Sequence, residues 1–114
     1  MWCLELLKRL KKSNKIKNRF INEINYDQML EIIKNNYTVI IDVRSKNEYN
    51  EGHINGAINI PLSKINSVIK IANKNDIIIV YCKLGIRSKK AVDILNKMGY
   101  NNVFSLKNGI EEIW

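Results

Sequence analysis

The feature that most constrains the fold of this sequence is a run of five large apolar residues at 77–81, bounded by Asp76 and Cys82. β-Branched and aromatic side chains suit a pleated strand, and a run without polar alternation is typical of a strand buried on both faces. Residues 37–41, Tyr-Thr-Val-Ile-Ile, repeat this pattern. Because parallel sheets are covered on both faces, the two runs predict an α/β protein.

Helical patterns lie between the predicted strands. Asn25 followed by Gln28 predicts a capping box that opens a helix over 26–35. The other expected helices are a short one from a Ser45 cap to Tyr49, one over 61–72 that starts at Pro61, and one over 88–98 that stops at Gly99. Shorter strands are expected at 20–24, 57–60 and 102–105, with a turn or helix at 109–114. This alternation predicts an α/β fold with a mostly parallel central sheet of about five strands and helices on both faces.

The chain of 114 residues is long enough for one domain. Its net charge of +8 is unevenly distributed, because residues 1–19 hold seven basic residues against one acidic residue. We therefore divide the chain into a basic amphipathic N-terminal segment, 1–19, and a nearly balanced domain, 20–114. A balanced domain surface is not expected to bind nucleic acid, and we expect a monomer.

The N-terminal segment has two interpretations. Apolar residues recur at helical spacing over 2–10, which indicates a short helix that lies on the domain, and we favour this interpretation. The alternative is a basic amphipathic helix that contacts an anionic membrane or a partner through residues 1–12. Glu5, Lys8 and Arg9 interrupt the apolar run, which argues against a membrane span or a secretory signal.

The two cysteines, Cys3 and Cys82, lie 79 positions apart and form no CxxC pair. Together with the lone His53 they do not form a metal-ligand cluster, so we expect no metal and no disulfide framework. Free cysteines fit a reducing compartment, and we expect a cytoplasmic protein.

The loop at 82–88, Cys-Lys-Leu-Gly-Ile-Arg-Ser, joins the most pronounced strand to the most pronounced helix. Ligands of parallel sheets bind at the carboxyl ends of strands, where Cys82 lies. Gly85 allows a tight loop whose N–H groups converge, the following helix directs its positive end there, and Lys83 and Arg87 add cations. Each influence favours the thiolate, which is the nucleophilic form of cysteine. A buried structural cysteine would fit better inside the apolar run than at its exit.

Five blocks of sequence, in order over residues 20–114, resemble a single-domain rhodanese, a sulfurtransferase. They are Ile41-Asp-Val-Arg44, Glu48-Tyr-x-x-Gly52-His-Ile-x-Gly56-Ala57-x-Asn-Ile-Pro61, Tyr81-Cys-x-x-Gly-x-Arg-Ser88, Ala91…Leu95…Gly99-Tyr100 and Leu106…Gly109-Ile…Trp114. The resemblance implies a rhodanese-like fold. Many relatives have two glycines where this chain has Asn108-Gly109, and asparagine tolerates the left-handed conformation.

The resemblance also implies a reaction that needs no cofactor. Cys82 would attack the outer sulfur of a small anionic donor such as thiosulfate, and its persulfide would pass sulfur to cyanide, a thiol or a protein acceptor. The loop residues Lys83, Leu84, Gly85, Ile86, Arg87 and Ser88 would bind the substrate. Asp42 and Arg44 end a strand nearby and are interpreted as supporting residues, and His53 as a turn residue.

Three other functions are weighed against this one. A cysteine phosphatase is disfavoured, because phosphatases have a longer spacing than the four residues between Cys82 and Arg87 and need a general acid. A sulfur relay would hand the persulfide to another protein. A binding or regulatory module would keep the fold without turnover, although the intact Cys82, Gly85 and Arg87 favour activity.

Overall fold

Five parallel strands form the sheet of this computed structural model, which describes residues 22–111 and 113. The strand order is β1-β5-β4-β2-β3, so the predicted run at 77–81 is the central strand. The bounds are β1 (Glu23–Ile24), β2 (Thr38–Asp42), β3 (Ile58–Asn59), β4 (Ile77–Tyr81) and β5 (Asn102–Leu106). The predicted five-strand parallel sheet is confirmed. The predicted N-terminal helix lies outside the described residues.

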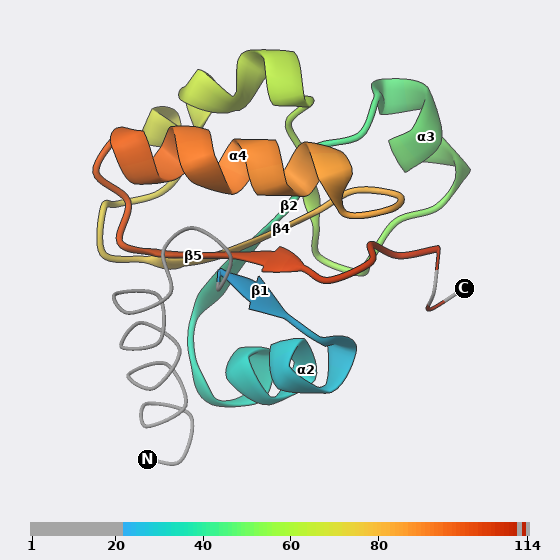
Figure 1. Cartoon of the computed structure of the whole chain (residues 1–114), viewed down its shortest axis with the longest axis horizontal. Coiled ribbons are helices and arrows are strands. Elements are labelled where there is room, and N and C mark those ends of the chain that lie inside the picture. Colours follow the sequence, from blue (N-terminus) through green and yellow to red (C-terminus); the bar gives the residue numbers. More distant parts are fainter. Residues whose placement is uncertain (1–21, 112, 114) are drawn as a thin grey trace.

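Helices cover both faces of the sheet, as predicted (Figure 1). Helix α2 (Tyr26–Asn35) packs on one face, whereas α4 (Ile86–Lys97) and the 3₁₀ helix η2 (Leu62–Lys70) pack on the other. The short helix α3 (Lys46–Glu51) lies beyond one end of the sheet. Among the described residues, no helix is long and apolar enough to cross a membrane.

Strand β4 contributes to the apolar core on both faces of the sheet. Ile78 and Val80 pack in the cluster beneath α4 and η2, whereas Ile79 and Tyr81 pack in the cluster against α2. All four side chains are buried. This double burial explains why the run carries no polar alternation, and the next residue in the alternation, Cys82, belongs to the α4 face.

Local sequence signals account for most helix ends. The capping box of Asn25 and Gln28 is present, and α2 has the predicted bounds. Ser45 and Glu48 form a second capping box, and α3 extends to Glu51, two residues beyond the prediction.

Two helix predictions are corrected by the structure. The helix expected over 61–72 is 3₁₀ over Leu62–Lys70, and its backbone leaves helical geometry at Lys64, so no continuous α-helix forms. Helix α4 starts at Ile86, two residues before the predicted start. Gly85 adopts the left-handed conformation there (φ 96°) and turns the chain directly into the helix.

Candidate functional site around Cys82

Cys82 directly follows the central strand β4 and lies four residues before the start of α4. Its Sγ accepts hydrogen bonds from the backbone N–H of Gly85 (3.1 Å) and of Ser88 (3.3 Å). The residue is 1% exposed, so these bonds are made in a largely dry environment. Two N–H donors and the positive end of a helix converge on one sulfur atom, which favours a negative charge on that atom.

Both cations of the loop are paired with carboxylates. The Arg87 guanidinium donates to the two oxygens of Glu48 at 2.8 and 3.1 Å, and the Lys83 ammonium lies 3.5 Å from Glu111. The hydrogen bonds with Glu48 raise the pKa of Arg87 further above its ordinary value. Each loop cation therefore has a carboxylate partner, and Arg87 also interacts electrostatically with Cys82, which helps to raise the pKa of the guanidinium.

The turn after β5 is hydrogen-bonded to the Cys82 loop. Ile110 N–H donates to the Cys82 carbonyl at 3.0 Å, and Glu111 N–H donates to the Lys83 carbonyl at 3.2 Å. The backbone approaches so closely that a Cβ atom on Gly109 would lie 2.2 Å from the Lys83 carbonyl oxygen. The neighbouring Asn108 has φ 62°, which confirms the expected tolerance of asparagine for the left-handed conformation.

Asp42 and Arg44 form a buried ion pair at the end of β2. The Arg44 guanidinium approaches the Asp42 carboxylate to 2.6 Å and also donates to the Gly52 carbonyl at 2.7 Å. Asp42 is fully buried and also accepts from the Arg44 N–H. The pair therefore ties the end of β2 to the segment after α3 and lies beside the site rather than at the sulfur.

His53 makes contacts within its own turn. Its ring stacks on Tyr49 with 3.7 Å between the ring centroids, and its Nδ1 lies 2.9 Å from the Tyr49 carbonyl oxygen. The neighbouring N–H of Ile54 donates to the buried Tyr81 hydroxyl. Burial raises the pKa of Tyr81, so that hydroxyl stays neutral.

A cavity of about 330 Å³ opens beside the loop. Its lining includes Arg44, Glu48, Glu51, Lys83, Ile110 and Glu111, from the segments that follow β2, β4 and β5 and from α3. It lies at the carboxyl ends of the parallel strands, where ligands of such sheets bind. Among the described residues, no group of three His, Cys, Asp or Glu side chains could hold a metal ion.

Sequence reasoning missed two residues near the sulfur. Glu48 occupies the third position of the Ser45 capping box, which is sufficient to explain its presence, so its pairing with Arg87 was not visible. Ser105 on β5 contacts Ser88 through a 2.6 Å hydroxyl contact. Its one sequence signal is a polar residue between the apolar Phe104 and Leu106 of β5.

Glu48 predicts an acid-sensitive contribution to folding. The hydrogen bonds from Arg87 lower its pKa from 4.5 to about 2. Because the folded-state pKa lies below the unfolded value, the contribution is fully present above a pH of about 4.5 and is lost as the pH falls toward 2. We expect the free energy of unfolding in urea to decrease over this range, and to decrease less in Glu48→Gln. Glu51→Gln on the same helix is the matched control, and equal acid sensitivity in Glu48→Gln and the wild type would contradict the assignment.

These features define a class of protein, an α/β domain whose central parallel strand leads into a cysteine loop of the Cys-x4-Arg type. Residues 25–114 match the rhodanese-like domain family. The chain belongs to this family, which confirms the resemblance that the sequence blocks carry.

Three relatives illustrate the match. The chain is 46% identical over 65 residues to thiosulfate sulfurtransferase PspE of Escherichia coli, across 55% of this chain and 62% of that protein. It is 33% identical over 89 residues to thiosulfate sulfurtransferase GlpE of Coxiella burnetii, across 78% of this chain and 83% of that protein. The human single-domain sulfurtransferase TSTD1 shares the fold, with a TM-score of 0.75 at 21% identity over 81% of this chain and 94% of that one. The match to PspE spans less than two thirds of that protein.

Proposed function

We propose that this chain is a sulfurtransferase and that Cys82 carries the transferred sulfur as a persulfide. The observation that supports this proposal most directly is the position of the Cys82 sulfur at the end of β4, where it accepts hydrogen bonds from two N–H groups of its loop. Relatives of the same family, PspE and GlpE, are named thiosulfate sulfurtransferases.

The proposed reaction has two balanced steps. The Cys82 thiolate attacks the outer sulfur of thiosulfate, a new S–S bond forms, and the bond to the inner sulfur breaks so that sulfite leaves with the electron pair. The persulfide anion then lies among the N–H groups of the loop. A nucleophilic acceptor such as cyanide or a thiolate attacks the terminal sulfur and releases the Cys82 thiolate.

The loop residues from Lys83 to Ser88 are proposed to bind the donor, chiefly through their backbone. Because Glu111 and Glu48 compensate Lys83 and Arg87, donor binding depends on N–H groups more than on these side chains. The side chains of Leu84 and Ile86 are 55% and 63% exposed, which supports an acceptor that approaches the rim by apolar contact. Asp42 and Arg44 are proposed to support the loop from the neighbouring strand end.

Two further properties belong to the same proposal. A nucleophilic cysteine is best maintained in a reducing compartment, and we propose the cytoplasm. The site is built from one copy of the chain, which fits a monomer as the working form.

Thiosulfate treatment followed by intact mass measurement tests the function. We expect the wild-type protein to gain one sulfur atom, cyanide to remove it, and Cys82→Ser to gain none. Cys3→Ser is the matched control, because it removes the other cysteine of the chain and should load like the wild type.

Failure to load with several sulfane donors would overturn the proposal. Hydrolysis of an aryl phosphate that depends on Cys82 would establish the phosphatase alternative instead. Loading without transfer to cyanide or small thiols would favour a relay to a protein acceptor.

A further inference from the structure

A pair of buried hydroxyl groups lies behind the Cys82 sulfur. Ser88 and Ser105 are 0% and 1% exposed, and their Oγ atoms are 2.6 Å apart. The Ser88 Oγ also lies 3.5 Å from the Cys82 Sγ. One hydroxyl therefore touches the sulfur, and a second hydroxyl, from a different strand, touches the first.

The place of Ser105 in the sheet makes this pairing unusual. Ser105 lies beside Val80 of β4 and Glu23 of β1, and it follows Val103 and Phe104, which are buried in the two apolar cores. A buried hydroxyl without a hydrogen-bond partner destabilises a protein by roughly 1–3 kcal/mol. The Ser105 hydroxyl contacts the Ser88 hydroxyl, and this contact accounts for its burial.

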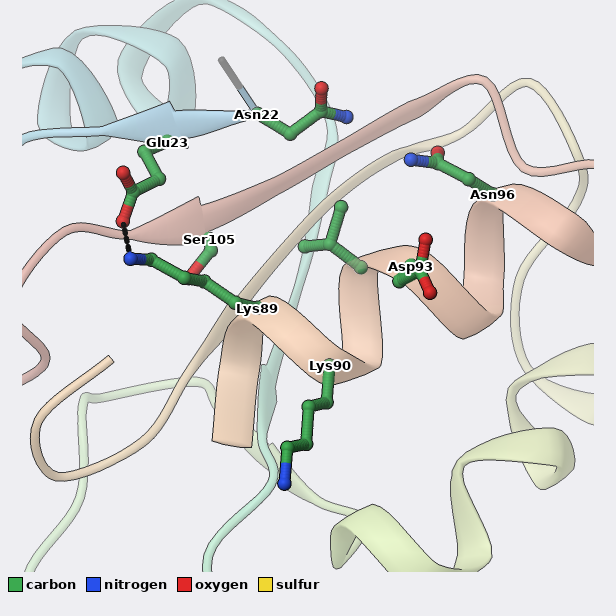
Figure 2. A pocket seen from close by; sticks show the side chains of 8 residues that line it. Asn22, Glu23, Lys89, Lys90, Asp93, Asn96 and Ser105 are labelled. Atoms are coloured by element: carbon green, nitrogen blue, oxygen red, sulfur yellow. Dashed lines mark ion pairs between the residues drawn. The ribbon is translucent and has the colours of Figure 1, made fainter. Parts of the chain in front are cut away.

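Figure 2 shows Ser105 at the wall of a second cavity, of about 320 Å³, between β1, β5 and α4. The ion pair of Lys89 with Glu23, at 3.3 Å, lies at the same cavity. These charged side chains belong to the cavity rim, whereas the Ser105 hydroxyl is directed to Ser88. Of the hydroxyl pair, Ser105 therefore lines this cavity, whereas Ser88 contacts the Cys82 sulfur.

The single proton of the Ser88 hydroxyl can point in more than one direction. When Cys82 is a thiol, the thiol donates to the Ser88 Oγ, and the Ser88 hydroxyl donates to the Gly85 carbonyl at 3.2 Å. When the sulfur is an anion, it can only accept, and the Ser88 hydroxyl can turn from the Gly85 carbonyl to donate to it. The Ser88 oxygen is then an acceptor for the Ser105 hydroxyl, and a donor at that position strengthens the bond from Ser88 to the sulfur.

We propose that Ser105 is a positioning residue that directs the Ser88 hydroxyl toward Cys82 and so stabilises the anionic sulfur, both as a thiolate and as a persulfide. This inference rests on the proposed role of Cys82 as a nucleophile. The charged groups near the sulfur are Lys83 and Arg87 from its loop, Glu48 from α3 and Glu111 after β5, and the Asp42–Arg44 pair lies farther off at the end of β2. The Lys89–Glu23 pair lies at the cavity that Ser105 lines. None of them is changed by a substitution at Ser105.

The test measures the rate at which iodoacetamide alkylates Cys82 as a function of pH, in a Cys3→Ser background so that one thiol reacts. We expect Ser105→Ala to raise the pH at which the alkylation rate is half-maximal by about one unit. Below that pH the variant should be alkylated up to about tenfold more slowly than the wild type. Ser105→Thr keeps a hydroxyl and should retain the wild-type profile. Ser67→Ala, which removes an exposed hydroxyl on η2, is the matched control.

A double substitution distinguishes positioning from a purely structural role. If Ser105 acts through Ser88, then Ser88→Ala/Ser105→Ala should have the same pH profile as Ser88→Ala alone. A lower melting temperature of Ser105→Ala with an unchanged profile would overturn the inference, and so would an effect of Ser105→Ala that persists without the Ser88 hydroxyl. Alkylation does not depend on sulfur transfer. A wild-type protein that fails to load from several sulfane donors would therefore refute the proposed function, and the alkylation test would still decide the role of Ser105.

Discussion

Gly109→Ala is expected to lower the free energy of unfolding by about 2–4 kcal/mol, because the new Cβ has no space and the backbone has a positive φ. That Cβ would lie 2.2 Å from the Lys83 carbonyl oxygen and 2.6 Å from the Cys82 carbonyl oxygen. Both contacts are with backbone atoms, so no side chain can rotate away to relieve them. Urea denaturation measures the loss, and the displaced loop should also slow alkylation of Cys82.

Gly56→Ala is the matched control for this prediction. Gly56 has φ +85°, close to the +69° of Gly109, but a Cβ atom on Gly56 would meet nothing within 4 Å. The free energy of unfolding of Gly56→Ala should therefore decrease by only about 1 kcal/mol, because alanine disfavours a positive φ. Equal losses in the two variants would show that the close contact with the Cys82 loop is not what requires glycine at 109.

Arg44→Ala is expected to destabilise the domain by about 3–5 kcal/mol, because it leaves the Asp42 carboxylate buried without its partner. Asp42 is 0% exposed and receives hydrogen bonds from the Arg44 side chain at 2.6–3.0 Å. The same substitution removes the bond to the Gly52 carbonyl, so the segment after α3 loses a tie to β2. The free energy of unfolding at neutral pH is the measurement.

An exposed ion pair provides the comparison. Lys97 and Asp93 lie 3.3 Å apart on α4, with side chains 77% and 63% exposed. Lys97→Ala should change stability by no more than about 0.5 kcal/mol, since water already solvates both charges. A loss of less than about 1 kcal/mol in Arg44→Ala would mean that the remaining donors, the Arg44 N–H and the Tyr81 hydroxyl, are sufficient to keep the Asp42 carboxylate buried.

The parts of the fold that were predictable from sequence depend on signals within a few residues of each other. The start of α2 follows from Asn25 and Gln28, whose side chains and backbone N–H groups bond reciprocally three positions apart. The position of β4 inside the sheet follows from its apolar run, because only a strand with helices packed on both faces of the sheet can bury every side chain of such a run. By contrast, the 3₁₀ geometry of η2 and the early start of α4 depend on backbone angles at Lys64 and Gly85 that no residue pattern specifies.

The candidate site also has a part that was predictable from local sequence and a part that was not. Cys82, Gly85 and Ser88 lie within seven consecutive residues, from the end of β4 to the first turn of α4, so their proximity could be inferred from the order of residues. The pairing of Arg87 with Glu48 joins positions 39 residues apart, and Ser105 reaches Ser88 across 17 residues and from a different element. Such contacts arise from the order of strands in the sheet. A single sequence contains no direct signal of that order.

The pairing of β1 with β5 has a consequence for the newly made chain. Glu23 aligns with Ser105 and Ile24 with Leu106, so β1 leaves the ribosome long before its neighbour in the sheet has been synthesised. The hydrogen bonds from Ile110 and Glu111 to the Cys82 loop also come from residues that are added after the loop itself. A nascent chain that already carries Cys82 therefore lacks the turn that holds its loop. The order of synthesis delays assembly of the reactive site until the sheet that supports it can close.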